Sequence, residues 1–402
     1  MKKLIKTNMP LIALIIAFAC CLTSHPVWSA NSLEITGFAR AVGGYLDTER
    51  ASFKGYENAF SMSEKSLAAV QADYQFSDAL SGSAQLLLHT SEERNSGVEW
   101  LYLTYSPHVD VVFNAGRLRT PFLKYSDVID VGYAYPWISA PQQLYGSYLF
   151  SQYEGVNVRY RQSINGFALG YEAYYGQYND DNNSTESDVS VNGLLGSVIN
   201  VDYEGFQVRL ASVNGSRVYA DIAEIAPLIG SLTSANFNST ADQLKINGSA
   251  NAYLFGLSYD SFKWYANTEW MRLTSNINVL GTISSFYISA GYYVDELLIH
   301  ITYASSRQSL PEFENNVPLN VNPQLNQLHN AVQQVSRAFP TNDLDSLTLG
   351  ARWDFMSNVA LKAEMTLLKG KPNKTSFFDL ASNGNDFDRK AVLSQIALEW
   401  VF

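Results

Sequence analysis

Most of this chain repeats one pattern, a segment of about ten residues in which apolar and polar side chains alternate. In one such segment Phe206, Val208 and Leu210 alternate with Gln207 and Arg209. A period of two residues predicts β-strands with one apolar and one polar face. We count sixteen segments, at 33–46, 65–76, 80–90, 97–106, 110–119, 148–161, 166–178, 191–203, 206–214, 251–260, 262–273, 284–294, 297–307, 345–355, 359–369 and 390–402.

The connections between these segments alternate between short and long. Seven are hairpin turns, such as those around Glu204 and Asp295. Eight are long loops, at 47–64, 91–96, 120–147, 179–190, 215–250, 274–283, 308–344 and 370–389. An even strand number with turns at one end and loops at the other is typical of outer-membrane barrels. Because hydrocarbon cannot satisfy backbone N–H and C=O groups, a sheet in a bilayer must close on itself. The sequence therefore predicts an all-β, sixteen-stranded antiparallel up-and-down transmembrane β-barrel.

The first 30 residues have the layout of a secretory signal peptide. They open with three lysines, continue with the apolar run Leu11 to Leu22 and end in small residues. The alternative, a lipoprotein signal at Cys20 or Cys21, lacks a leucine in the usual place. We expect a signal peptide at 1–30 and one barrel domain at 31–402.

Removal of the signal peptide changes the composition. It takes both cysteines, and it takes three lysines but no acidic residue, so the net charge falls from −11 to −14. The absence of cysteine after the signal peptide excludes a disulfide framework and a thiolate metal site. The acidic balance suggests a mild preference for cations. After the signal no apolar run approaches the ~18 residues of a transmembrane helix.

A soluble sandwich or propeller would also show many short strands. The strict alternation of turns and loops, the absence of a repeat period and a last strand that ends on Phe402 favour the membrane barrel.

Three stretches resemble the Gram-negative outer-membrane porin superfamily. They are the opening strand LEITGFARAVGGYL, the block AGRLRTPFLKYSDVIDVGYAYPWISAPQQLYG and the terminal Phe402. The chain looks like a general or substrate-selective porin of a gammaproteobacterium. The resemblance implies a homotrimer and a third loop, here residues 120–147, that folds into the pore and narrows it. The loop lacks the PEFG segment of classical enterobacterial porins.

Charged side chains on the polar faces are the candidates for function. Arg40, Arg352 and Lys362 lie on strands that meet when the barrel closes, and could form one basic wall. The alternative is that they are solvated and paired with acids such as Asp354 and Glu364. Opposed charges across a narrow aqueous neck favour polar solutes. We predict that the pore is lined or narrowed by Arg40, Arg117, Arg119, Lys124, Asp127, Asp130, Arg209, Arg352 and Lys362.

Two of these arginines have an ambiguous direction. Phe113 and Ala115 share a strand face with Arg117 and Arg119, so regular alternation would point both arginines outward. We expect a β-bulge at Gly116 that turns them inward. Without a bulge, they would belong to the rim or to a subunit interface.

The aromatic side chains and long loops offer further expectations. Tyr133, Tyr135 and Trp137 could pack the third loop against the wall, or stack on sugar rings. Apolar residues at helical spacing predict a short amphipathic helix at 325–339, and another is possible around 220–228. The polar and acidic tract 180–188 predicts a solvated loop, and the alternative is a site that binds a divalent ion.

The sequence shows no G-x-S-x-G, H-E-x-x-H or P-loop run, although catalytic groups can also assemble only in space. We therefore expect no enzyme, cofactor or metal. The expected function is passive diffusion of small hydrophilic solutes and ions. The expected surroundings are outer-membrane lipid and lipopolysaccharide, without nucleic acid. The alternatives are a channel selective for oligosaccharides or anions, and a surface receptor or adhesin.

Overall fold

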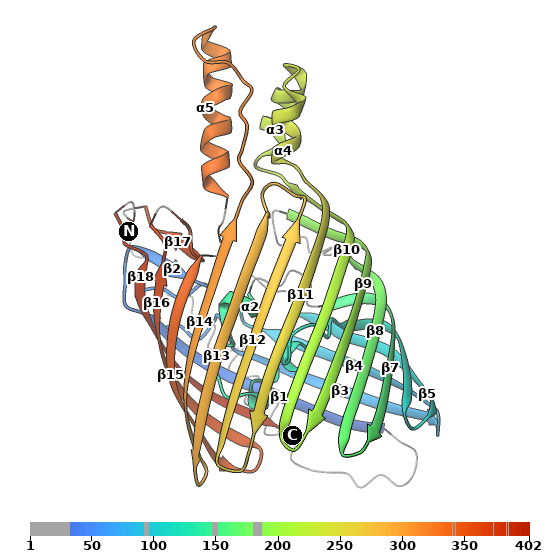
Figure 1. The fold of residues 1–402 in the computed structure, drawn as a ribbon. Coiled ribbons are helices and arrows are strands. Elements are labelled where there is room, and N and C mark those ends of the chain that lie inside the picture. The colour runs from blue at the N-terminus through green and yellow to red at the C-terminus, as the bar shows by residue number, and fades with distance from the viewer. Residues whose placement is uncertain are drawn as a thin grey trace.

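The computed structural model describes residues 33–91, 96–146, 152–179, 187–339, 341, 343–372, 374–382, 384 and 386–402. Sixteen strands form one closed antiparallel barrel (Figure 1). They follow one another around the barrel in chain order, and the first strand closes the cylinder by pairing with the last. This confirms the predicted fold. The signal peptide and most of the 180–188 tract lie outside the described residues.

The barrel strands coincide with the sixteen predicted segments, and several are longer. They are β1 (Leu33–Leu46), β3 (Leu67–Ser77), β4 (Leu80–His89), β5 (Gly97–His108), β6 (Val111–Arg119), β7 (Gln152–Ile164), β8 (Phe167–Asn179), β9 (Ser187–Tyr203), β10 (Phe206–Ile222), β11 (Ile246–Asp260), β12 (Trp264–Ser275), β13 (Thr282–Val294), β14 (Leu297–Ser309), β15 (Leu344–Met356), β16 (Val359–Gly370) and β18 (Lys390–Val401).

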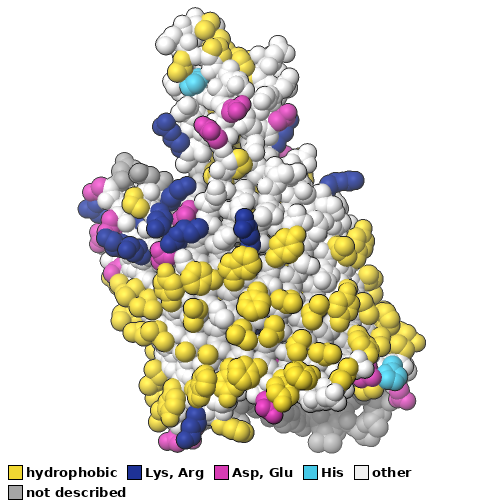
Figure 2. Space-filling view, in the orientation of Figure 1, with side chains coloured by type: hydrophobic (Ala, Val, Ile, Leu, Met, Phe, Trp, Pro, Cys, Tyr) yellow, Lys and Arg dark blue, Asp and Glu magenta, His cyan; other side chains and the backbone are white. Residues whose placement is uncertain are grey.

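Alternation along each strand separates an apolar outer face from a lumen face. On β14, Ile299, Ile301 and Tyr303 are exposed on the outside, whereas His300 and Thr302 are buried toward the lumen. The outward side chains of the strands form a broad apolar band on the face shown in Figure 2, with Lys and Arg gathered above it toward the long-loop end. This band is a surface that hydrocarbon can cover without leaving a backbone edge unpaired.

Two loops pack together at the long-loop end beside the closing seam. The short strands β2 (Ala51–Phe53) and β17 (Phe378–Leu380) pair with each other. Buried side chains such as Tyr56 and Leu393 join them in one apolar cluster. The first loop, residues 47–66, is therefore fixed against the last long loop and the ends of neighbouring strands.

Three helices stand above the barrel (Figure 1) and pack on one another. They are α3 (Ala226–Ser234), α4 (Asn238–Leu244) and α5 (Pro323–Ala338). The helix predicted at 325–339 is present, and the Asn322 side chain caps it by accepting a hydrogen bond from the Leu325 N–H at 2.8 Å. The helix expected around 220–228 begins later, because β10 continues to Ile222. Within the described residues no helix is long and apolar enough to cross a membrane.

Candidate functional site

The third loop leaves β6 and lies inside the barrel. It contains two short 3-10 helices, η1 (Ser126–Val128) and η2 (Gly132–Ala134), and one helical turn, α2 (Gln142–Tyr145). Its first part is held by the wall of β10 to β12. The Arg209 guanidinium donates to the carbonyls of Phe122 (3.2 Å) and Pro121 (2.6 Å). Lys124 donates through its backbone N–H to Glu269 and through Nζ to Ser258, both at 2.8 Å. Arg209 and Lys124 thus hold the loop.

The second part of the loop is held by the opposite wall. Lys362 on β16, Arg352 on β15 and Arg40 on β1 all donate hydrogen bonds to loop carbonyls. The Lys362 ammonium makes three such bonds at 2.7 to 2.9 Å, the closest Arg352 contact is 2.7 Å and the Arg40 contact is 2.5 Å. The carbonyls belong to Gly132, Tyr133, Tyr135, Trp137 and Ile138.

Carboxylates complete this wall. Glu399 on β18 lies between two cations, 2.8 Å from Arg40 and 2.5 Å from Lys362. Glu364 accepts a hydrogen bond from the Ile138 N–H at 2.8 Å. Arg352 also pairs with Asp354 at 2.8 Å. The three basic residues do come together, as expected of a basic wall. However, they bind the loop backbone and acids rather than facing open water.

One glycine permits the close approach of loop and wall. A Cβ at Gly132 would lie 2.2 Å from the Glu399 carboxylate and 2.9 Å from the Arg40 guanidinium carbon. Both of those side chains are buried and paired, so neither can move aside cheaply. Position 132 therefore has to lack a side chain for the loop to dock.

Aromatic packing fills the space between the loop and β13 and β14. Trp137 is 1% exposed, donates from Nε1 to Thr302 Oγ1 at 2.8 Å and meets the Tyr287 ring edge-on at 5.4 Å. Tyr135 is also buried, whereas Tyr133 lies against the Arg352 guanidinium at 4.5 Å. Of the two roles expected for Tyr135 and Trp137, packing against the wall is the one seen.

Arg119 and Asp130 meet in a buried ion cluster at the root of the loop. Arg119 pairs with Asp130 and, at 2.7 Å, with Glu99 on β5. The register between β4 and β5 shifts at this point, because Gln85 pairs with Trp100 but Leu86 pairs with Val98. Glu99 is the extra residue of that bulge, which accounts for its position beside the inward-facing Trp100.

Arg117 does not take part in this cluster, and the prediction of a bulge at Gly116 is wrong. The register passes through Gly116 without a shift on both neighbouring strands. Arg117 therefore stays on the outer face with Ala115 and pairs there with Glu154 at 2.8 Å, both side chains well exposed. Arg119 turns inward because the strand ends there, so the two arginines have opposite directions.

Asp127 faces a cavity below the loop. Its side chain is exposed, and it lines a cavity of about 110 Å³ together with Arg119, Arg159 on β7 and Glu172 on β8. Acidic and basic side chains thus face each other across this space. Arg159 was missed in the sequence, although its alternation with Val158 and Tyr160 could have assigned it to the lumen.

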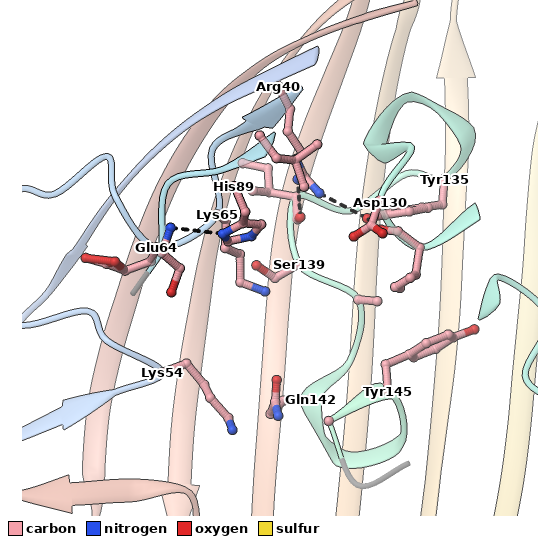
Figure 3. Close-up of a pocket in the computed structure, with 16 residues that line it drawn as sticks. Arg40, Lys54, Glu64, Lys65, His89, Asp130, Tyr135, Ser139, Gln142 and Tyr145 are labelled. Carbon is pink, nitrogen blue, oxygen red and sulfur yellow. Dashed lines mark hydrogen bonds between the residues drawn. The ribbon is translucent and has the colours of Figure 1, made fainter. Parts of the chain in front are cut away.

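A second cavity, of about 340 Å³, lies between the third loop and the first loop (Figure 3). Its charged lining residues are Arg40, Lys54, Glu64, Lys65 and Asp130. Lys54 had no signal in the sequence, because loop residues have no alternation that gives them a direction. Lys65 was included in the segment predicted at 65–76, but the strand β3 begins only at Leu67. Burial lowers the pKa of Lys65 to about 8, helped by the nearby positive charges of Arg40 and Lys54.

A sealed sixteen-stranded barrel with a loop folded into its lumen is the architecture of outer-membrane porins. Solved structures of several outer-membrane proteins share this fold. They include OmpF of Salmonella typhi in complex with daunomycin (15% identity, TM-score 0.56, covering 92% of this chain and 98% of that one). Others are OmpT of Vibrio cholerae in a trimer form (13%, 0.53, 93% and 100%) and the anion-selective porin from Comamonas acidovorans (12%, 0.53, 93% and 100%). No protein-family model and no curated protein matches the sequence.

Proposed function

We propose that this chain is an outer-membrane porin that lets small hydrophilic solutes and ions diffuse passively through a water-filled pore narrowed by the third loop. One observation carries the proposal. The loop is anchored on opposite walls inside a sealed barrel, yet cavities lined by charged side chains lie on two sides of it. A barrel that served only as a membrane anchor would not require polar space at its centre. Passive transport needs no nucleophile, metal or cofactor, and we propose no enzymatic activity.

The proposal includes location and assembly. The predicted signal peptide would direct export, and the apolar outer band fits lipid, with lipopolysaccharide in the outer leaflet. A solved barrel of the same fold is described in a trimer form, which supports a homotrimer here. The trimer is tested by measuring the mass of the detergent-solubilised protein before and after heating.

The decisive experiment is electrical recording from the purified protein in a planar lipid bilayer, with liposome swelling for uncharged solutes. We expect discrete conductance steps and swelling rates that fall with solute size. Circular dichroism confirms that the sample is folded. A folded, inserted protein that carries no current and no solute contradicts the proposal.

A second candidate function is a surface receptor, and the helices above the barrel favour it. Leu232 of α3, Leu244 of α4 and Val332 of α5 are buried in a shared apolar cluster that contains no lumen residue. A protein used only as a pore would not need such a module. Replacing 223–245 and 310–343 with short turns distinguishes the two functions, because flux that survives favours the pore.

A further inference from the structure

Two neighbouring cavities at the mouth of the lumen share a border made by two lysines. The larger one is the 340 Å³ cavity described above, and a smaller one of about 40 Å³ extends beneath the first loop. Both are lined by Lys54 and Lys65 of the first loop and by Ser139 and Gln142 of the third. Figure 3 shows the two lysine side chains reaching toward Ser139 and Gln142.

The described residues that line the smaller cavity supply many hydrogen-bond donors and no carboxylate. Tyr56 is fully buried and Gln395 is 6% exposed, and both line it. The Gln395 side chain donates a hydrogen bond to the Tyr56 hydroxyl oxygen, and among the described residues neither that hydroxyl nor Gln395 Nε2 has a further partner. The Tyr56 O–H and the second Gln395 N–H then still need an acceptor. Because buried donors without an acceptor are costly, they point to a ligand that accepts hydrogen bonds.

The carboxylates near the two lysines already have other partners. Glu64 accepts from the hydroxyls of Ser61 (2.6 Å) and Ser63 (2.9 Å). Asp130 pairs with Arg119, and Glu364 accepts from the Ile138 N–H. Glu399 lies between Arg40 and Lys362. The Lys54 ammonium lies 5.6 Å from the centre of the Phe377 ring, and no carboxylate of the described residues forms an ion pair with it.

We propose that Lys54, Lys65, Tyr56 and Gln395 form a binding site for the oxyanion group of a solute that enters the pore. The site rests on the proposed function and adds a solute class to it, a small molecule that carries a carboxylate or a phosphate. Two ammonium groups supply the charge, and two buried donors supply direction for the oxygens. Although the whole chain is acidic, the local field at this entrance is positive and attracts anions.

Two measurements on the full-length protein test the site. The first is the chloride current through single channels, with inorganic phosphate or malonate added at constant ionic strength and glucose as the uncharged control. The second is calorimetric binding of the same anions to the detergent-solubilised protein, which reports on the site even if no current flows. We expect phosphate, malonate or both to block the current and to bind, and glucose to do neither. The anion that binds identifies the solute as phosphate-bearing or carboxylate-bearing.

The double variant Lys54→Gln, Lys65→Gln should weaken block and binding by about tenfold or more, because charge-assisted hydrogen bonds are lost. Tyr56→Phe removes one buried hydroxyl and should weaken block and binding less than the double variant does. It provides the test if the double variant does not fold. The matched control is Lys369→Gln, because Lys369 is exposed on the outer face of β16. No anion binding to the folded wild type, or equal binding by wild type and double variant, would overturn the site. Channels that conduct but are neither blocked nor bound by the anions would contradict the binding site and still support the proposed pore.

Discussion

Arg40 on the first strand and Glu399 on the last are direct cross-strand partners, and their side chains form an ion pair 2.8 Å long across the closing seam of the barrel. The same carboxylate binds Lys362, and both cations bind the third loop. The seam and the loop are therefore held by one buried charge cluster. Such a cluster adds little net stability when intact, but breaking it leaves a charge without compensation.

Glu399→Gln should be the most damaging single change at the seam. It leaves Arg40 and Lys362 buried without their shared counter-ion, at a cost of about 3–5 kcal/mol. The measurement is urea unfolding followed by circular dichroism or by electrophoretic mobility. Glu296→Gln, in an exposed turn, is the control and should change the unfolding free energy by less than about 0.5 kcal/mol. Equal unfolding free energies of the two variants would contradict the role of Glu399 as the shared counter-ion of Arg40 and Lys362.

Gly132→Ala should displace the third loop. The added methyl group would meet Glu399 and Arg40, and overpacking of this kind costs about 1–3 kcal/mol. We expect a lower unfolding temperature and a changed single-channel conductance. Gly230→Ala is the matched control, because a Cβ there meets nothing within 4 Å and lies in a helix. Unaltered conductance in Gly132→Ala would mean that the loop does not set the width of the pore.

Arg117 and Arg119 should behave differently although they are two residues apart. Arg117→Gln removes an exposed ion pair and should cost about 0–1 kcal/mol, with no effect on conductance. Arg119→Gln removes the cation that the buried Glu99 and Asp130 share, and should cost about 3–5 kcal/mol. Comparing urea unfolding of the two variants tests the opposite directions assigned to them. Similar losses would show that both side chains point the same way.

Asp127 and Arg159 should shift ion selectivity in opposite directions. Asp127→Asn removes a negative charge from the cavity below the loop and should favour anions, whereas Arg159→Gln should favour cations. The measurement is the reversal potential in a salt gradient. The shifts should shrink at high ionic strength because salt screens the field. Shifts of the same sign in both variants would mean that these residues do not face the permeation path.

The selectivity should also depend on pH through Lys65. Because the pKa of Lys65 is lowered to about 8, its side chain is charged below that pH and neutral above it. The permeability of anions relative to cations should therefore fall as the pH rises from 7 to 9. Lys65→Arg keeps its charge throughout this range and should remove the dependence. A pH dependence that persists in the variant would assign the titration to another group.

Much of the fold follows from local pattern. Alternation of period two is a property of each segment, so strand number, chain order and closure could be predicted before any contact was known. The capped helix α5 follows from local spacing in the same way. The pattern failed where a strand ends, at Arg119, because alternation no longer fixes direction there. It also gave no direction for Lys54, which lies in a loop, and it placed Lys65 in a strand that begins only at Leu67.

By itself, the sequence determined that this chain closes into a sixteen-stranded barrel with charged residues on its inner face. Only the tertiary structure decided which of those charges hold the third loop and which meet water. Lys362 contacts carbonyls 225 to 230 residues away in the chain, and Arg40 contacts one 98 residues away. A cation that holds the loop and a cation that meets water show the same alternation in the sequence. The two roles differ only in the partner, and that partner is distant in the chain.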